Sequence, residues 1–136
     1  MEVQCTHNLL PRRGTPNSAG LDFYTNKDIY IKSKELKQIN SGIRVKLPEN
    51  HFGFLQIRSS LAMKQLITFA GIIDPDFTGE IKVLLKNFGD EDIEIKRGER
   101  FCQLLVLPCW DGPIKEVSYL ESSMTRGSKG FGSTGK

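Results

Sequence analysis

Hydrophobic residues recur at every second position in several short segments, and this alternation constrains the fold of the chain more than any other feature. It is seen over residues 43–47, 81–86 and 92–96, where Ile, Val and Leu alternate with charged side chains. A period of two places the apolar side chains on one face of an extended backbone, so each segment is predicted to be a half-buried strand. Residues 101–107 are apolar at all but one position, which predicts a strand buried on both faces and ended by Pro108.

Turn-forming residues separate these segments at short intervals, as at residues 40–42 and 48–50. Many short strands with frequent turns predict an all-β sandwich or barrel. Residues 59–65 depart from this pattern, because two serines that can cap a helix precede several helix formers, so we expect one short helix there. The chain of 136 residues suits a single domain, expected over residues 1–122. Residues 123–136 lack apolar periodicity and are predicted to form a flexible, glycine-rich tail.

The net charge and the cysteine content limit which partners and which cellular compartment the chain is expected to have. The formal net charge of +3 is too small to require a nucleic acid as partner. Cys5, Cys102 and Cys109 are odd in number and lack a C-x-x-C spacing, which favours free thiols in a reducing compartment. No apolar segment reaches the length of a signal peptide or a membrane span. We therefore expect a soluble intracellular protein without a membrane partner, in the cytoplasm or nucleus of a cell or of a virus's host.

The C-terminal segment, residues 126–135, combines glycines with cations, hydroxyls and one aromatic residue. Its glycines allow backbone N–H groups to converge on an anion, and Arg126 can hold phosphate oxygens in bidentate fashion. Ser133 and Thr134 offer hydroxyls, and the ring of Phe131 can stack on a base. The composition alone equally allows a solvated tail or a segment that contacts nucleic acid loosely, and the P-loop sequence is absent.

A second candidate segment, residues 71–79, carries two carboxylates around a proline. On an extended backbone Asp74 and Asp76 project from the same face, and we expect Gly71 and Gly79 to bracket a hairpin. A carboxylate on a rigid hairpin can orient and deprotonate a water molecule. An ordinary Asp-Pro-Asp turn is the alternative.

Three further segments carry polar residues at positions where they could bind a ligand. Arg58 and Ser59 stand at the start of the expected helix, where free N–H groups favour phosphate, although plain capping explains them equally well. Gln103 is the polar exception in an apolar strand and needs a hydrogen-bond partner if it is buried. Asp22 lies inside the apolar segment 21–24, and pairing with an arginine such as Arg58 is the simplest explanation.

These five segments, in their order along the chain, resemble the five motifs of the trimeric dUTP pyrophosphatase (dUTPase) family, and the resemblance extends from Ala19 to Gly135. It implies a jelly-roll-like β-barrel of the dUTPase β-clip type that assembles as a homotrimer, with active sites shared between chains. The implied enzyme is a Mg²⁺-dependent dUTP diphosphatase that hydrolyses dUTP to dUMP and pyrophosphate. This reaction limits uracil incorporation into DNA and supplies dUMP for dTTP synthesis.

The resemblance also implies a role for each matching residue. Asp74 is the implied catalytic residue and activates the water that attacks the α-phosphorus. The implied substrate-binding residues are Arg58, Ser59, Ser60, Gly71, Ile73, Phe77, Gln103, Arg126, Phe131, Gly132, Ser133 and Thr134.

Within that set, Phe77 packs under the sugar and leaves no room for a 2′-hydroxyl, while backbone groups of residues 68–73 read uracil. Phe131 stacks over uracil, and residues 132–134 contact the γ-phosphate. The triphosphate and waters hold Mg²⁺ without a direct protein ligand, and Asp22 acts through Arg58 or a Mg²⁺-bound water.

The chain departs from the usual family pattern at a few positions. Phe77 stands where Tyr is usual and Ser60 where Gly is frequent, while Phe101 and Cys102 replace smaller or aliphatic residues. None of these changes removes an essential chemical group.

Three alternative functions compete with this assignment. One is dCTP deaminase, whose relatives share the fold but are longer and lack such a tail. A second is a non-catalytic dUTPase-like protein that binds dUTP or a protein partner. A third, a nucleic-acid-binding β-barrel, leaves Asp74 and Ser59 unexplained. A zinc deaminase is disfavoured because neither His7 nor His51 begins an H-x-E sequence.

Overall fold

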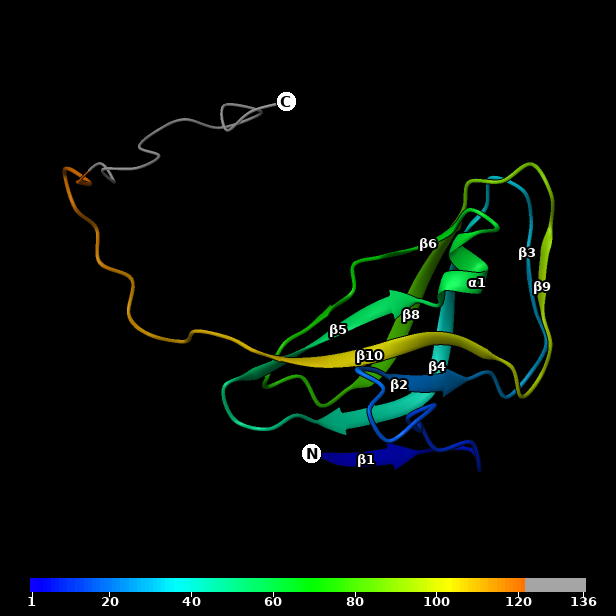
Figure 1. Ribbon diagram of the computed structural model, residues 1–136, viewed down its shortest axis with the longest axis horizontal. Helices are drawn as coiled ribbons and strands as arrows, with labels where there is room; N and C mark the ends of the chain where they lie inside the picture. Colours follow the sequence, from blue (N-terminus) through cyan, green and yellow to red (C-terminus); the bar gives the residue numbers. More distant parts are fainter. Residues whose placement is uncertain (122–136) are drawn as a thin grey trace.

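Ten strands and one short helix make up the fold over residues 1–121, the part of the chain that the computed structural model describes (Figure 1). One four-stranded sheet has the order β1–β4–β8–β6, formed by β1 (Glu2–Cys5), β4 (Leu36–Lys46), β8 (Glu80–Asn87) and β6 (Leu66–Phe69). The other has the order β2–β10–β5–β7, formed by β2 (Leu21–Tyr24), β10 (Arg100–Pro108), β5 (His51–Ile57) and β7 (Ile72–Ile73). A separate ribbon pairs β3 (Ile29–Ile31) with β9 (Ile93–Ile95), and the helix is α1 (Ser59–Ala62).

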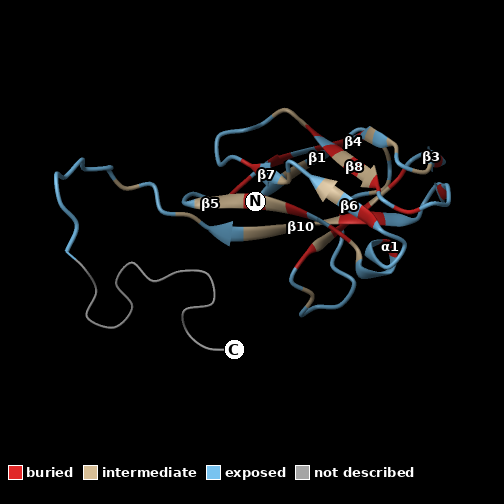
Figure 2. Ribbon diagram, turned by 90° about the horizontal axis from the view of Figure 1, so that it is seen from above, coloured by how far each residue is buried: buried red, intermediate tan, exposed pale blue. Residues whose placement is uncertain are grey.

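The core lies between the two larger sheets and continues under the β3–β9 ribbon (Figure 2). Alternating residues of each strand point inward, and Val83, Leu55 and Leu104 from β8, β5 and β10 are among the fully buried side chains. All strand pairs among the described residues are antiparallel. The predicted all-β barrel with one short helix is therefore confirmed, and the helix is shorter than predicted.

The prediction that residues 101–107 form a strand buried on both faces is wrong for a single chain. Cys102 and Leu104 point into the core, but Leu105 and Val106 are only half-buried and Leu107 is 37% exposed. The apolar residues on the outer face of β10 therefore lack a cover from within the described part of their own chain.

The expected hairpin between Gly71 and Gly79 is also wrong. β7 pairs with β5 in one sheet, whereas β8 pairs with β4 and β6 in the other. The connecting segment is a crossover with a tight turn, closed by a hydrogen bond from the backbone N–H of Phe77 to the carbonyl oxygen of Asp74 (3.1 Å). The turn is built from Asp, Pro and Asp, residues that favour turns.

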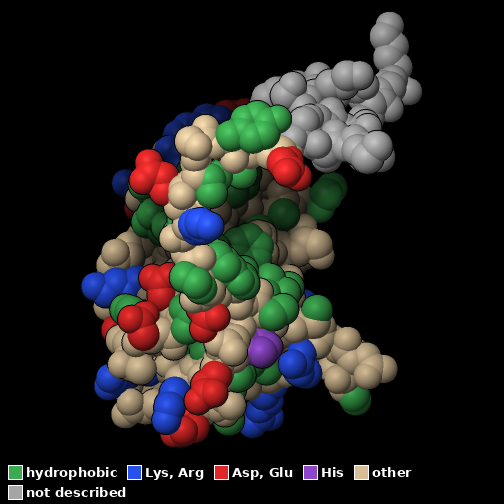
Figure 3. Space-filling model, turned by 90° about the vertical axis from the view of Figure 1, so that its left-hand side faces the viewer, with side chains coloured by type: hydrophobic (Ala, Val, Ile, Leu, Met, Phe, Trp, Pro, Cys, Tyr) green, Lys and Arg blue, Asp and Glu red, His purple; other side chains and the backbone are tan. Residues whose placement is uncertain are grey.

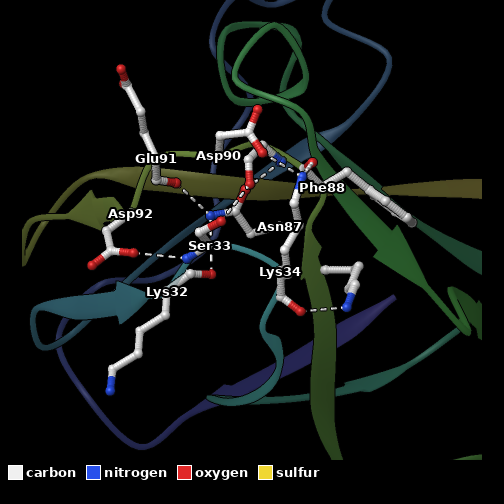
Figure 4. A network of polar contacts seen from close by, with 10 residues as sticks. Lys32, Ser33, Lys34, Asn87, Phe88, Asp90, Glu91 and Asp92 are labelled. Atoms are coloured by element: carbon white, nitrogen blue, oxygen red, sulfur yellow. Dashed lines mark hydrogen bonds and ion pairs between the residues drawn. The ribbon is translucent and has the colours of Figure 1, made fainter.

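A buried polar cluster fixes the β3–β9 ribbon to the barrel (Figure 4). The side-chain amide of Asn87, which is fully buried, donates to the carbonyl oxygens of Ile31, Lys32 and Glu91 and accepts from the N–H of Gly89. Every polar atom of this amide is therefore satisfied, as a buried amide requires. The cluster explains why a polar residue can end the apolar pattern of β8.

The strands of the barrel end at Pro108, and residues 109–121 carry no regular secondary structure and extend away from the barrel (Figure 1). Their large apolar side chains are exposed, including Trp110, Ile114 and Leu120. The predicted tail residues Arg126, Phe131, Gly132, Ser133 and Thr134 lie outside the described residues.

The three cysteines are free thiols, as predicted, and no helix in the described residues is long and apolar enough to cross a membrane. Cys102 is fully buried while Cys5 and Cys109 are half-buried. Burial, with a smaller contribution from the nearby charge of Asp22, raises the pKa of the Cys102 thiol well above its usual range. Cys102 is therefore a neutral core residue.

Candidate active site

One end of the site is organised around the carboxylate of Asp22. Its Oδ1 lies 3.3 Å from Nε of Arg58, and its Oδ2 lies 3.2 Å from Nη1 of Arg100. Asp22 is only 7% exposed, so burial of its charge requires such partners. The predicted pairing with Arg58 is confirmed, and a second arginine takes the other oxygen.

Strand register explains why these residues meet. Asp22 pairs with Gln103, and Gln103 pairs with Gln56, so the three lie side by side across β2, β10 and β5. Directly paired residues share a face of a sheet, and here it is the outer face, because the neighbours Phe23, Cys102 and Ile57 point into the core. The side chain of Gln103 is half-buried and lies over the backbone of Gly20.

The segment before β2 covers Asp22 from outside. Arg12 and Asp22 form an isolated bridge in which the N–H of Asp22 donates to the carbonyl oxygen of Arg12 (2.8 Å). Gly14 lies against both the Asp22 carboxylate and the Arg100 guanidinium. The Asp22 carboxylate is therefore shielded from solvent although it stands on the outer face of a sheet, while both arginines stay partly exposed.

Arg58, Ser59 and Ser60 follow the end of β5, as expected, and Ser59 and Ser60 are exposed. α1 is a single turn, and the first N–H with a partner inside it is that of Leu61, which donates to the carbonyl oxygen of Arg58. The N–H groups of Ser59 and Ser60 precede it and remain open to an external acceptor. No side chain caps the helix, so the capping explanation of these serines is not supported.

A cavity of about 360 Å³ opens beside this cluster. Its polar lining consists of three cations, two hydroxyls and two carboxylates: Arg58, Lys64, Arg100, Tyr24, Ser60, Glu94 and Glu99. A larger cavity of about 450 Å³ lies beside residues 63–65, after α1, but four acidic residues, 90–92 and Glu94, line it with the single cation Lys64. Of these two cavities, cations outnumber carboxylates only in the lining of the smaller, so that cavity fits a polyphosphate better.

The second part of the site is the segment around β7. Gly71 accepts a hydrogen bond from the N–H of Leu55 (2.7 Å), and a Cβ at position 71 would come within 2.6 Å of the carbonyl oxygen of Leu55. Only glycine permits this approach to β5. Ile73 pairs with Gly53 and buries its side chain in the core, so only its backbone can contact a ligand.

Asp74 and Phe77 occupy the exposed turn that follows β7. The Asp74 carboxylate forms no ion pair or side-chain hydrogen bond with any residue of the described chain. The ring of Phe77 is 41% exposed and lies on Gly79, where an added Cβ would approach its Cζ within 2.7 Å. Arg44 from β4 donates through Nε to the carbonyl oxygen of Thr78 (2.7 Å). This hydrogen bond ties the turn between β7 and β8 to β4.

The two parts lie at opposite ends of β5. Ile73 pairs with Gly53, and Arg58 stands five positions further along the chain. At the rise of a β-strand this corresponds to roughly 17 Å. Within one chain, Asp74 and Arg58 are therefore too far apart to act on the same phosphate group.

Comparison with known proteins decides the family. The dUTPase family model matches residues 7–135. The chain belongs to the dUTPase family. It is 38% identical over 138 residues to the deoxyuridine 5′-triphosphate nucleotidohydrolase of Candida glabrata, covering 100% of this chain and 95% of that protein. It is 40% identical over 131 residues to the Rattus norvegicus protein of the same name, covering 96% of this chain and 63% of that protein.

The fold agrees with that of solved dUTPases. The dUTPase of Staphylococcus bacteriophage 80alpha, solved with dUPNHPP, superposes with a TM-score of 0.90 at 27% identity, over 99% of this chain and 98% of that chain. The jelly-roll-like barrel expected from the sequence is therefore the fold of this dUTPase family member.

Arg100 is the site residue that sequence reasoning missed. In the sequence only Gln103 stands out here, because Arg100 directly precedes the apolar strand, as a solvent-facing cation often does. A signal was present in the adjacent residues Phe101 and Cys102, two consecutive apolar residues at a strand start. Such a pair breaks strict alternation. In the structure a β-bulge between Arg100 and Cys102 lets both apolar side chains point into the core.

Proposed function

We propose that this dUTPase family member hydrolyses dUTP to dUMP and pyrophosphate through an active site assembled from neighbouring chains. The observation that carries the proposal is the cluster of Asp22 with two arginines beside the open N–H groups of Ser59 and Ser60. Phosphoryl transfer depends on positioning and on charge neutralisation, and this cluster supplies both.

The phosphate end binds the triphosphate through Arg58, Ser59, Ser60 and Gln103. Arg58 uses Nε for Asp22, so its two terminal nitrogens stay available for a bidentate contact with phosphate oxygens. The serines add backbone and hydroxyl donors, and the Gln103 amide adds a neutral donor from the adjacent strand.

Asp74 acts as the general base toward the attacking water. Its carboxylate is exposed after the end of β7 and is not engaged by another described side chain. Either of its oxygens is therefore free to accept the proton of the attacking water. The water then attacks the α-phosphorus, and pyrophosphate leaves. General-base assistance of this kind contributes about 10²–10⁴-fold to the rate.

Mg²⁺ fits this site as an ion carried by the substrate. Residues 1–121 contain no group of three His, Cys, Asp or Glu side chains that could hold a metal, and both oxygens of Asp22 face guanidinium groups. Mg²⁺ commonly takes substrate phosphates and waters as ligands, so no protein cluster is needed. When bound, the ion neutralises charge on the phosphate oxygens. Asp22 acts on it through a bound water or on the substrate through Arg58.

The nucleoside end is formed by Gly71, Ile73 and Phe77. Backbone groups of residues 68–73 read the uracil edge, because the Ile73 side chain is buried and Gly71 has none. Phe77 places an exposed ring beneath the sugar, which excludes a 2′-hydroxyl by contact. A group that reads the uracil edge rejects cytosine because the 4-position reverses the donor and acceptor pattern.

A homotrimer supplies the two parts from different chains. Arg58 lies roughly 17 Å along β5 from Gly53, and Asp74 lies one residue beyond the Gly53 partner Ile73, so a single chain does not bring both to one phosphate. The outer face of the same sheet is apolar where Phe54 pairs with Leu105 and with Ile72, and Ile72 is 56% exposed. Figure 3 looks onto the left-hand end of the molecule in Figure 1, where strands β5 and β10 are seen end-on, and shows hydrophobic side chains exposed between charged ones at that end as well. An uncovered apolar surface of this kind favours association with further copies of the chain.

The C-terminal segment completes the proposed site. Arg126 and residues 132–134 contact the phosphates, and Phe131 stacks on uracil. This part of the proposal rests on the family relationship and on the chemistry of these residue types, because residues 122–136 lie outside the described structure.

The proposal is tested by measuring pyrophosphate release from dUTP, dTTP, dCTP and UTP in the presence of Mg²⁺. We expect rapid release from dUTP and at least 10²-fold slower release from the other three, because each loses a specific fit or hydrogen bond. Equal turnover of all four would contradict the specificity. Binding of dUTP without turnover would instead support the non-catalytic alternative.

A further inference from the structure

Arg100, the first residue of β10, contacts Asp22 and contributes its charge to the cluster, but the function proposed above gives it no contact with the substrate. Its Nη1 lies 3.2 Å from Oδ2 of Asp22, while Arg58 approaches Oδ1 through Nε at 3.3 Å. Each carboxylate oxygen is therefore held by a different arginine, one from the start of β10 and one from the end of β5. A carboxylate fixed at both oxygens cannot rotate about its terminal bond without losing a contact.

A β-bulge brings Arg100 to this position. Cys102 pairs with Phe23, but Arg100 pairs with Tyr24, so Phe101 is the extra residue in β10. Phe101 and Cys102 are consecutive and both buried, at 1% and 0% exposed. With regular alternation Arg100 would face the same side as Cys102, which is the core. The bulge returns it to the outer face, as bulges beside active sites commonly do for a functional side chain.

Both arginines also line one cavity. The space of about 360 Å³ beside the cluster is bordered by Arg58, Arg100 and Ser60. The side chains of Arg58 and Arg100 are 29% and 40% exposed, whereas that of Asp22 is 10% exposed. Asp22 is thus an enclosed carboxylate that links two guanidinium groups, and both guanidinium groups remain open to the cavity. In the lining of this cavity three cations, Arg58, Lys64 and Arg100, outnumber the two carboxylates of Glu94 and Glu99, and a net positive charge suits a polyphosphate.

We propose that Arg100 is a positioning residue for phosphate binding. It holds Asp22 in one orientation, and Asp22 in turn holds Arg58 by Nε so that the terminal nitrogens of Arg58 face the substrate. This inference rests on the proposed function, since it assumes that Arg58 binds the triphosphate. A displacement of about 1 Å in a positioning group lowers catalytic efficiency by up to about 10²-fold.

The test compares Arg100→Met with Arg97→Met. Arg97 is an exposed cation three positions upstream, and its side chain forms no ion pair within residues 1–121, so both variants lose the same charge from the same region. We expect Arg100→Met to lower kcat/KM for dUTP by about 10–10²-fold, mainly through KM, and to weaken competitive inhibition by inorganic pyrophosphate by a similar factor. Arg97→Met is expected to change both quantities less than about twofold, as general attraction of an anion is only slightly reduced. Equal effects of the two variants would overturn the inference.

A double-mutant cycle with Asp22→Asn separates positioning through Asp22 from direct contact with substrate. If Arg100 acts through Asp22, Arg100→Met adds little once Asp22 is changed. If the two losses multiply, Arg100 acts on the substrate directly and the positioning role is wrong. Arg100→Lys is expected to recover only part of the activity, because a lysine offers one charged nitrogen in place of a planar fork.

A purely structural role of Arg100 predicts a different result. It would lower the midpoint of urea unfolding without changing KM or the inhibition by pyrophosphate in the folded fraction, and that outcome would also overturn the inference. Failure of the proposed function itself is recognised separately, because the unchanged chain would then release no pyrophosphate from dUTP.

Discussion

The two ends of strand β5 differ in how far one chain completes them. At the Arg58 end, a buried carboxylate, two arginines and open N–H groups are already in place. At the Gly53 end, the turn after β7 presents the Asp74 carboxylate and the Phe77 ring to solvent. No described side chain pairs with Asp74. The first end is preorganised for an anion, whereas the second exposes a carboxylate and an aromatic ring that no described side chain pairs with.

This difference indicates how catalysis is divided within the proposed enzyme. Charge neutralisation needs groups fixed before the substrate arrives, and burial of Asp22 fixes them. A general base needs a free carboxylate that meets the substrate, and exposure at a turn provides it. Because the two lie at least roughly 17 Å apart along β5, the proposed site takes them from different chains.

The largest effect is expected from Asp74→Asn. This change keeps the size and shape of the side chain but replaces the carboxylate with an amide that cannot act as a base, so turnover should fall by about 10²–10⁴-fold with dUTP binding retained. Single-turnover pyrophosphate release and the dissociation constant of dUTP measure the two quantities. Asp76→Asn, two positions away on the same turn, is the matched control and should retain most of the activity. A near-normal rate in Asp74→Asn would remove this residue from its proposed role.

A mixture of two inactive variants tests the division between chains. Asp74→Asn and Arg58→Ala chains, each inactive alone, should regain activity when they are co-expressed and purified as mixed trimers. Random assembly would leave about a quarter of the sites with both residues intact, if the two residues of a site come from different chains. No recovery in trimers shown to contain both chains would mean that one chain supplies both residues.

Much of the fold and part of the site were predictable from local pattern. The strands at residues 43–47 and 81–86 follow from alternation, which depends only on one face meeting the core. The pairing of Asp22 with Arg58 follows from the cost of burying a charge. These predictions succeeded because each depends on residues close in the sequence or on the free-energy cost of burying an unpaired charge.

The errors arose where long-range pairing decides the outcome. Residues 71–79 suggested a hairpin, but the two flanking strands belong to different sheets. β7 pairs with β5 in one sheet, and β8 pairs with β4 in the other. The second arginine on Asp22 depends on a bulge that only the register with β2 reveals. The apolar outer face of β10 suggested burial that a single chain does not provide.

A smaller effect is expected from Gly79→Ala, which acts on the nucleoside end alone. The backbone at Gly79 does not have a positive φ, so alanine is tolerated there, but its Cβ would meet the Phe77 ring at 2.7 Å. The ring must shift, and the preference for dUTP over UTP should fall by about tenfold. The ratio of kcat/KM for the two nucleotides measures this. In a Phe77→Ala background the same change should have no further effect, and a persistent loss there would show that Gly79 acts without the ring.

The smallest effect is expected from Thr68→Val on β6, in the segment proposed to read uracil through its backbone. The hydroxyl oxygen of Thr68 is buried and has no hydrogen-bond partner within residues 1–121, so its replacement by a methyl group should raise the free energy of unfolding by about 1 kcal/mol. Thr25→Val is the matched control: its hydroxyl accepts from the N–H of Lys27 (3.3 Å) and donates to the carbonyl oxygen of Lys27, so the same substitution should destabilise the protein. Urea unfolding at one protein concentration compares the two variants. An increase in KM for dUTP in Thr68→Val would show that the side chain, and not only the backbone, serves the nucleoside end.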